Sequence, residues 1–219
     1  MTSLRAVAWD IDGTLIDSEP LHDAVLNEIC FSYGATLADI PPDHFRGVHM
    51  PDVWKALQPR HPKGLEEKEW YDAIIGRYVE RAVELQPLPG ALETMRALSA
   101  AGIRQVCVSN SGRRVVDANL AALAILDLID FSISLDDVSA GKPEPEPYLL
   151  AARRLGIPTA EIAAVEDSVA GATSARAAGL RVFGLAAMEG GHIEPAHVTI
   201  HRLHDLPGLI LPPQPVRAR

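Results

Sequence analysis

The stretch Ala6-Val7-Ala8-Trp9-Asp10-Ile11-Asp12-Gly13-Thr14 decides the fold of this chain. Its first four residues form an uninterrupted apolar run, which is typical of a strand buried on both faces of a parallel sheet. The run ends at Asp10, and Gly13 permits a sharp turn because it has no side chain to clash. Two carboxylates therefore follow a predicted buried strand at its carboxyl end, where parallel sheets bind their ligands.

The rest of the chain repeats this alternation of apolar runs and helical patterns. Helical periodicity predicts three helices, each ending at a glycine that can adopt the left-handed cap conformation, over residues 91–101, 147–155 and 169–178. Apolar runs predict further strands at residues 103–108, 162–165 and 181–185, with an edge strand at 198–200. Strands that alternate with helices in this way indicate an α/β fold around a parallel sheet.

One long segment departs from the alternation. Between Ser18 and Leu88 the sequence shows no clear strand, but it shows helical patterns over residues 21–33 and 66–85. We therefore expect two domains: an α/β core of residues 1–17 and 88–219, and an inserted helical domain of residues 18–87. The alternative is a set of ordinary crossover helices within one domain.

Composition narrows the possible partners. The net charge of −9 argues against non-specific binding of nucleic acids, because there is no basic excess to neutralise phosphates. No apolar run is long enough to span a membrane, and the one near the N-terminus is too short for a signal peptide. Cys30 and Cys107 lack metal-ligand spacing, which favours reduced thiols in a cytoplasmic protein. We expect a monomer with a loosely ordered tail from Leu211.

Polar residues suited to phosphoryl chemistry follow three of the predicted strands. Taken singly, each group has a structural explanation: a turn for Asp-x-Asp, a helix N-cap for Glu-Asp-Ser, and a surface position for a lone lysine. Together they predict one site at the carboxyl edge of the sheet. The groups are Asp10 and Asp12; Ser109, Asn110 and Ser111; Glu166, Asp167 and Ser168; and Lys142, which lies in a Gly-Lys-Pro loop before a helix.

The residue types indicate a division of roles. Asp10 can act as nucleophile, because a carboxylate is ionised without the help of a base. Asp12 can protonate the leaving alcohol and later activate water. Glu166 and Asp167 can hold Mg²⁺ together with Asp10, because Mg²⁺ prefers hard oxygen ligands and bridges to phosphate.

The remaining groups of the predicted site suit a phosphate. Ser109 and Asn110 offer hydroxyl and backbone donors to phosphoryl oxygens, and Lys142 offers a fixed positive charge. The bound substrate is therefore expected to be a small phosphorylated molecule.

Over nearly the whole chain, about residues 5 to 210, these motifs resemble those of the haloacid dehalogenase superfamily. The matching segments are Asp10-x-Asp12-Gly13-Thr14-Leu15-x-Asp17-Ser18, Ser109-Asn110, Gly141-Lys142-Pro143 and Glu166-Asp167-Ser168-x-x-Gly171. The resemblance implies a Rossmann-like three-layer core with a helical cap inserted after the first motif. It implies Asp10 as nucleophile, Asp12 as general acid/base, and Ser109 and Lys142 as phosphate ligands.

The resemblance also implies a magnesium site. Asp167 would bind the metal with Asp10 and the backbone carbonyl of Asp12, and Glu166 would bind it directly or through water. True dehalogenases of the superfamily lack the second aspartate, so Asp12 favours phosphate chemistry.

Within the superfamily, the chain resembles the subgroup that contains β-phosphoglucomutase and small sugar-phosphate phosphatases. The segment from Asp17 to His22 and Phe45-Arg46-Gly47 carry this likeness, and they make His22 and Arg46, with His49, candidates for substrate contacts. The mutases show Ser-Lys-Asn where this chain has Ser111-Gly112-Arg113, although Arg113 or Arg114 could replace the lysine. We therefore predict a magnesium-dependent phosphatase, with a mutase or an inert scaffold as alternatives.

Overall fold

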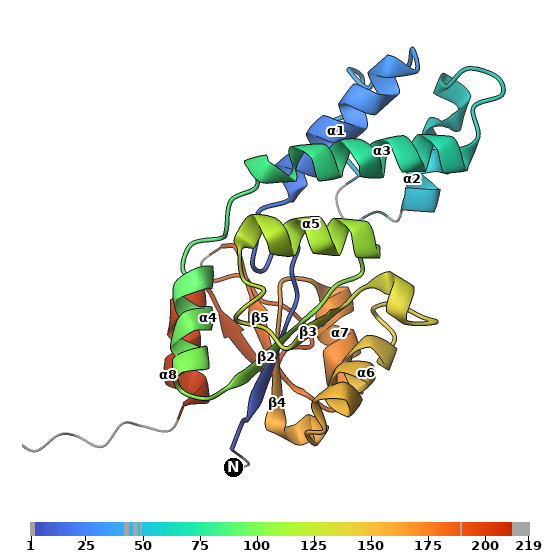
Figure 1. Cartoon of the computed structure of the whole chain (residues 1–219). Coiled ribbons are helices and arrows are strands. Elements are labelled where there is room, and N and C mark those ends of the chain that lie inside the picture. The colour runs from blue at the N-terminus through green and yellow to red at the C-terminus, as the bar shows by residue number, and fades with distance from the viewer. Residues whose placement is uncertain (1–2, 42–43, 46–47, 49, 189, 212–219) are drawn as a thin grey trace, which may run out of the picture. The chain divides into compact units, whose positions relative to one another are not determined.

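The computed structural model describes residues 3–41, 44–45, 48, 50–188 and 190–211. The chain divides into two compact units (Figure 1). One comprises Met1–Asp17 and Gln86–Arg219, and the other Ser18–Leu85. The first unit is the α/β core, and the second consists of helices and connecting loops.

A six-stranded parallel sheet forms the centre of the α/β unit. The strand order is β3-β2-β1-β4-β5-β6, so the first strand of the sequence lies near the middle and is completely buried. This confirms the predicted parallel α/β fold. The strands are β1 (Ala6–Trp9), β2 (Arg104–Val108), β3 (Phe131–Ile133), β4 (Ile162–Glu166), β5 (Arg181–Leu185) and β6 (Val198–Ile200).

Helices cover both faces of this sheet, which gives the predicted three layers. Figure 1 shows α4 (Ala91–Ala100) and α8 (Leu206–Ile210) on one side, and α6 (Glu146–Leu155) and α7 (Val169–Ala177) on the other. Side chains alternate along β1, so this strand packs against the helices on both faces of the sheet. Ala6 and Ala8 face the cluster that contains α6 and α7. On β1 the buried Trp9 donates its indole N–H to Gln105, whose amide binds a carbonyl of α4.

The sequence located most of this unit but not all of it. The predicted strands and the three glycine-terminated helices are confirmed to within one or two residues. Two elements were missed: β3 and the helix α5 (Arg113–Leu123). β3 has only three residues, and α5 begins with two arginines after a polar turn, which obscures its start.

The helical unit has a small core of its own. It contains α1 (Glu19–Ser32), α2 (Met50–Leu57) and α3 (Glu67–Arg81), with short 3-10 turns at Gln58–Arg60 and Ala82–Glu84. Residues spaced three to four apart on α1 and α3 are buried, as an amphipathic helix requires. Among the described residues of 18–85 there is no strand.

The two chain segments that join the units pair with each other inside the α/β unit. The Asp17 N–H donates to the Gln86 carbonyl at 3.2 Å, and the Leu88 N–H donates to the Leu15 carbonyl at 2.9 Å. Ile16 and Pro87 form an antiparallel bridge between them. Gln86 and Pro87 therefore belong to the α/β unit, whereas the sequence analysis placed this boundary after residue 87.

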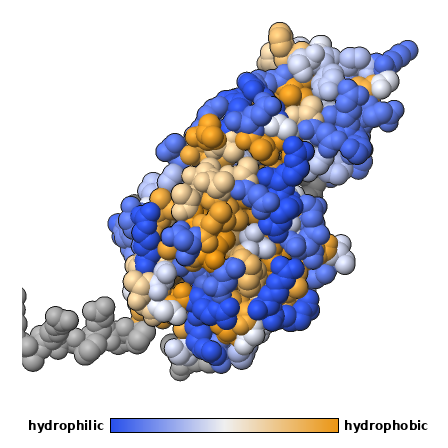
Figure 2. All heavy atoms as spheres, viewed as in Figure 1, coloured by the Kyte–Doolittle hydropathy of each residue, from blue (hydrophilic) through white to orange (hydrophobic). Residues whose placement is uncertain are grey.

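Surface polarity differs between regions of the face drawn in Figure 2. Hydrophobic residues gather over the part of the α/β unit where α4 and α5 lie, two helices rich in alanine and leucine, and hydrophilic residues dominate elsewhere. In the described part of the chain, no helix combines the length and the apolar character that crossing a membrane requires. The predicted tail beyond Leu211 lies outside the described residues.

Candidate active site

The register of the sheet brings the three polar strand ends together. Trp9 of β1 lies opposite Cys107 of β2 and Val165 of β4, so the next residues, Asp10 and Glu166, are neighbours. The Asp10 N–H continues the ladder by donating to the Val165 carbonyl at 3.0 Å. Ser109 is fixed in the same way by a bond from its N–H to the carbonyl of Ile133. The site therefore lies at the carboxyl edge of the sheet.

The turn after β1 depends on Gly13. Its φ of +77° lies in the left-handed region that favours glycine. A Cβ at this position would also overlap the carboxylate of Asp167. Gly13 thus permits the turn and allows the backbone after Asp12 to approach Asp167 closely.

Lys142 is the buried cation of the site. Its side chain is only 4% exposed, and its Nζ lies 2.6 Å from both Asp10 Oδ1 and Glu166 Oε1. The ammonium also donates to the Val108 carbonyl at 2.8 Å. The lysine therefore joins the ends of β1, β2 and β4 in one polar cluster.

Asn110 holds the loop that carries this lysine. Its Oδ1 accepts from the Lys142 backbone N–H at 2.7 Å, and its Nδ2 donates to the Lys142 carbonyl at 3.0 Å. A Cβ at Gly141 would contact the Asn110 side chain, so the glycine makes this close pairing possible. The side chain of Asn110 therefore positions the lysine loop, while its predicted role toward phosphate rests on its backbone N–H.

Burial dominates the electrostatics of the acids. It raises the pKa of Asp10, against the opposing effect of Lys142. Burial also raises the pKa of Glu166 to about 8 and that of Asp167 to about 7. The pKa of Lys142 is raised as well, because Asp10 and Glu166 outweigh the lowering effect of burial. The cluster thus holds more buried acid than one ammonium can neutralise.

Three of these carboxylates form a group suited to a metal ion. Asp10, Glu166 and Asp167 each offer an oxygen, and these oxygens lie within 4.8 Å of one another. Hard oxygen donors are the ligands that Mg²⁺ prefers. A divalent cation would also supply the positive charge that the cluster needs, so the residues fit such an ion.

Two further contacts lie next to Glu166 and Asp167, at the end of β4. The Tyr148 hydroxyl, which is buried, donates to Glu166. Ser168 caps α7 by accepting from the Gly171 N–H at 3.1 Å, and a Cβ at Gly171 would overlap Glu166. The N-cap interpretation of Glu-Asp-Ser therefore applies to Ser168, while the two acids face the site. Sequence reasoning did not find Tyr148.

Asp12 accepts hydrogen bonds from neutral donors. Its Oδ2 accepts from Ser111 Oγ at 3.1 Å and from Ser109 Oγ at 3.3 Å. Its Oδ1 accepts from Asn119 Nδ2 at 2.9 Å. Sequence reasoning also missed Asn119, although an asparagine in the apolar stripe of a helix is a signal that can be read.

The predicted substrate residues lie in the helical unit. His22 stacks on Tyr78 within that unit, with ring centroids 4.3 Å apart and planes 20° apart. Arg46 and His49 lie outside the described residues. In the α/β unit, Arg113 is bound by Asp117, Asp137 and Ser132. These contacts engage the Arg113 guanidinium within the α/β unit.

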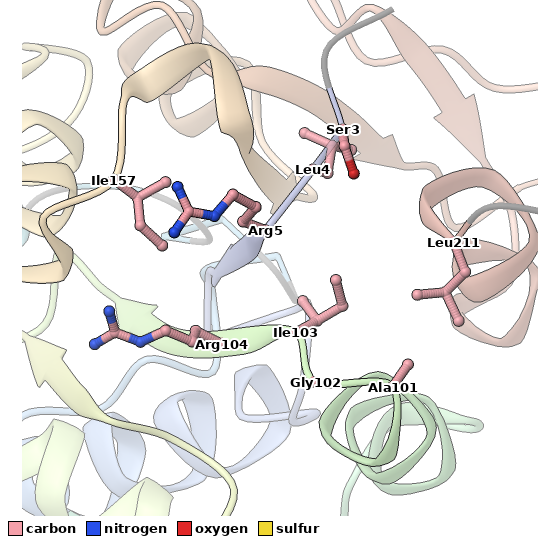
Figure 3. Close-up of a pocket in the computed structure, with 9 residues that line it drawn as sticks. All are labelled: Ser3, Leu4, Arg5, Ala101, Gly102, Ile103, Arg104, Ile157 and Leu211. Carbon is pink, nitrogen blue, oxygen red and sulfur yellow. The ribbon is translucent and has the colours of Figure 1, made fainter.

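A hollow of about 330 Å³ lies at the opposite, amino-terminal edge of the sheet (Figure 3). Arg5 and Arg104 line it, next to the first residues of β1 and β2. Both cations have acidic partners, Glu161 and Asp130. This hollow is therefore distinct from the site at the carboxyl edge.

The geometry defines an α/β enzyme with an acidic, lysine-containing site beyond the central strands of its sheet. Family comparison makes the class specific. Residues 4–179 match the model of the haloacid dehalogenase-like hydrolases. The chain belongs to this family and is a hydrolase.

Curated relatives agree with this assignment, and a solved structure shares the fold. The chain is 34% identical to protein CbbY of Rhodobacter capsulatus, covering 82% of this chain and 84% of that protein. It is 30% identical to hexitol phosphatase B of Escherichia coli (strain K12), and the match covers 81% of this chain and 82% of that protein. The crystal structure of CbbY from Rhodobacter sphaeroides in complex with phosphate shares the fold, with a TM-score of 0.81 and 24% identity over 93% of this chain and 96% of that one.

Proposed function

We propose that the chain is a magnesium-dependent phosphatase that hydrolyses a small phosphorylated metabolite through an aspartyl phosphate on Asp10. The observation that carries this proposal is the contrast between the two aspartates. Asp10 is buried beside an ammonium, whereas Asp12 is half-buried and held by neutral hydroxyl and amide donors. Two carboxylates in different environments suit a nucleophile and a proton-transfer group.

In the first step, a carboxylate oxygen of Asp10 attacks phosphorus and the bond to the leaving oxygen breaks. Lys142 holds Oδ1 of Asp10 and places its positive charge beside the incoming phosphoryl group. Ser109, at the end of β2, offers its hydroxyl to a phosphoryl oxygen. Asp12 donates its proton to the leaving alkoxide, so that an alcohol departs and Asp12 becomes a carboxylate.

In the second step, water attacks the phosphorus of the aspartyl phosphate. Asp12 takes a proton from this water, the bond between Asp10 and phosphorus breaks, and inorganic phosphate is released. Asp12 is then protonated again and Asp10 is a free carboxylate, so the cycle closes without another reactant.

Asp10, Glu166 and Asp167 would hold the magnesium ion, with the backbone carbonyl of Asp12. When bound, the ion supplies charge that offsets repulsion between the carboxylate nucleophile and the phosphate dianion. Glu166 is oriented for this task by Lys142 and Tyr148.

The names of the relatives support a class of substrate for this proposal. A relative named as a hexitol phosphatase supports a phosphorylated sugar or polyol as substrate. We infer that the helical unit acts as a cap domain, with His22 and Arg46 as contacts for the sugar end. The mutase alternative is less well supported, because Arg113 is engaged by Asp117 and Asp137. The inert-scaffold alternative is disfavoured by the complete set of acids.

Phosphate release from a panel of esters tests the proposal. The panel contains hexose and hexitol phosphates, phosphogluconate, phosphoglycolate and p-nitrophenyl phosphate, each with and without magnesium. β-Glucose 1-phosphate is followed both for free phosphate and for glucose 6-phosphate. Magnesium-dependent release is the expected result.

Two other outcomes would replace the proposal. Conversion of glucose 1-phosphate to glucose 6-phosphate with little free phosphate would establish the mutase. No turnover of any ester, with or without magnesium, would support an inert scaffold.

A further inference from the structure

We propose that Asn119 is a positioning residue for Asp12, which fixes the carboxylate so that Oδ2 is the oxygen that transfers the proton. The inference rests on the proposed function, because it assigns a role within the same reaction. It concerns a residue on α5, outside every strand-end motif of the site.

Asn119 is a polar residue on the buried, otherwise apolar face of α5. The other residues that α5 buries are apolar, namely Val115, Val116, Leu120 and Leu123. Asn119 lies on this stripe and is completely buried. A buried amide is costly unless it is hydrogen-bonded, so an apolar residue would stabilise this face better. The position therefore calls for an explanation beyond packing.

The partner of the amide supplies that explanation. Asn119 Nδ2 donates to Asp12 Oδ1 at 2.9 Å across 107 residues of sequence. Asp12 lies on the turn after β1, so the bond joins a helix of the scaffold to a turn of the site. A side chain held by a rigid helix positions a reacting group more accurately than one held by a loop.

Three neutral donors bind the two oxygens of Asp12 differently. Asn119 donates to Oδ1, whereas Ser109 and Ser111 donate to Oδ2. Ser109 is also proposed to bind a phosphoryl oxygen, so its bond to Asp12 competes with substrate. The bond from Asn119 has no such competitor in the proposed reaction, and it can persist throughout.

This division decides where the proton resides. An amide N–H is only a donor, so Oδ1 must remain an acceptor as long as the bond to Asn119 persists. A carbonyl oxygen is a better acceptor than a hydroxyl oxygen, so the bond from Asn119 favours the acid form of Asp12 that carries its proton on Oδ2. That oxygen faces the two serines at the end of β2, where the phosphoryl group is expected, and it both gives the proton to the leaving group and accepts one from water.

The leaving group provides a readout that a purely structural role would not change. An alkyl alcohol is a poor leaving group and needs a proton from Asp12, whereas p-nitrophenolate leaves readily without one. The ratio of kcat/KM for a sugar phosphate to kcat/KM for p-nitrophenyl phosphate therefore measures how much the reaction depends on the proton from Asp12. It reports steps up to alcohol release, and it is independent of the amount of folded enzyme.

We expect Asn119→Leu, which has a similar shape but no donor, to lower this ratio about 10- to 100-fold, since loss of accurate positioning has effects of this size. Asn119→Ala tests the same bond if the leucine variant does not fold. Leu120→Ala is the matched control, because Leu120 is buried on the same helix. It should lower the thermal midpoint and leave the ratio unchanged.

The remaining outcomes separate the two proposals. Asp12→Asn should lower the ratio at least as much as Asn119→Leu. A wild-type enzyme that releases no phosphate would overturn the proposed function itself. An active wild type with a low ratio in Asp12→Asn, but an unchanged ratio in both Asn119 variants, would overturn the role of Asn119 alone.

Discussion

Two regions of the molecule use ion pairs of similar length in opposite settings. In the α/β unit, Lys142 Nζ lies 2.6 Å from Asp10 and from Glu166, with all three side chains at most 10% exposed. In the helical unit, Glu28 lies 2.6 Å from Arg77 and 2.9 Å from Arg81, and its side chain is 42% exposed. The distances are nearly equal, but the surroundings differ.

Environment rather than distance decides what each pair does. Exposed pairs contribute little to stability, because water screens the charges and the long side chains lose freedom. Buried charges are costly to desolvate, and apolar residues of the same size often stabilise a protein better. A buried cluster of one ammonium and several carboxylates therefore indicates a functional site. The exposed network around Glu28 is explained as part of a solvated surface.

Asp10→Asn tests the buried side of this comparison with the largest expected effect. Turnover should fall by about 10⁴-fold or more, because the amide cannot form the acyl phosphate. Circular dichroism and thermal unfolding should show a retained fold, since a neutral amide avoids the cost of burying a charge. Phosphate release at the wild-type rate would remove Asp10 from the reaction.

Lys142→Met tests the cluster as a unit, with Glu28→Gln as the exposed counterpart. Removing the ammonium leaves Asp10 and Glu166 buried together, and we expect the free energy of unfolding to fall by about 3 kcal/mol. Activity should also be lost, because the phosphoryl group loses its fixed cation. Glu28→Gln should leave both the denaturant midpoint and turnover unchanged. Equal losses of stability in the two variants would contradict the comparison.

Tyr148→Phe tests the support of Glu166 with a smaller change. The variant removes only the hydroxyl that donates to this carboxylate. Residues that orient metal ligands influence metal affinity, so the magnesium concentration for half-maximal activity should rise about 10-fold. Calorimetric titration of magnesium checks the same quantity without turnover. Unchanged affinity by both methods would assign Tyr148 to packing alone.

Asp137→Asn addresses an intermediate case, a partly buried carboxylate away from the acids of the site. Although burial opposes it, hydrogen bonds from Ser134 and Arg113 lower the pKa of Asp137 to about 2, from a usual value of 3.8. A lowered folded pKa stabilises the protein above pH 4, and this stabilisation is lost as the pH falls through 2.

Denaturant unfolding of wild type and Asp137→Asn at a series of pH values measures this effect. The difference in free energy of unfolding should be about 1 kcal/mol at pH 6, because solvent screens part of the interaction. It should shrink towards zero near pH 2. A difference that is constant with pH would show that the charge of Asp137 contributes nothing.

The sequence allowed the α/β fold to be predicted because its signals are local. A four-residue apolar run before Asp10 and three helices ending at glycine depend on neighbours in the chain. β3 was missed because three residues carry too little pattern, and α5 because its first turn is polar. The boundary after Leu85 needed the pairing of Ile16 with Pro87, which no local pattern specifies.

The residues of the candidate site show the same difference between local sequence signals and tertiary contacts. The sequence could predict candidate residues that follow a strand or belong to a motif, namely Asp10, Asp12, Ser109, Lys142, Glu166 and Asp167. Asn119 and Tyr148 lie inside helices and act on residues distant in sequence, so only the folded chain brings them to their partners. The hydrogen bonds of the Asn110 side chain to Lys142 could not be predicted either, because they depend on tertiary structure.

The most direct test of the central claim is rapid acid quenching of the enzyme during turnover, followed by mass spectrometry of its peptides. With magnesium and a substrate from the ester panel, we predict one phosphoryl group on the peptide that contains Asp10. The adduct should be absent from Asp10→Asn and from enzyme without substrate. Release of phosphate by the wild type with no adduct at any quench time, or an adduct on another residue, would contradict nucleophilic catalysis by Asp10.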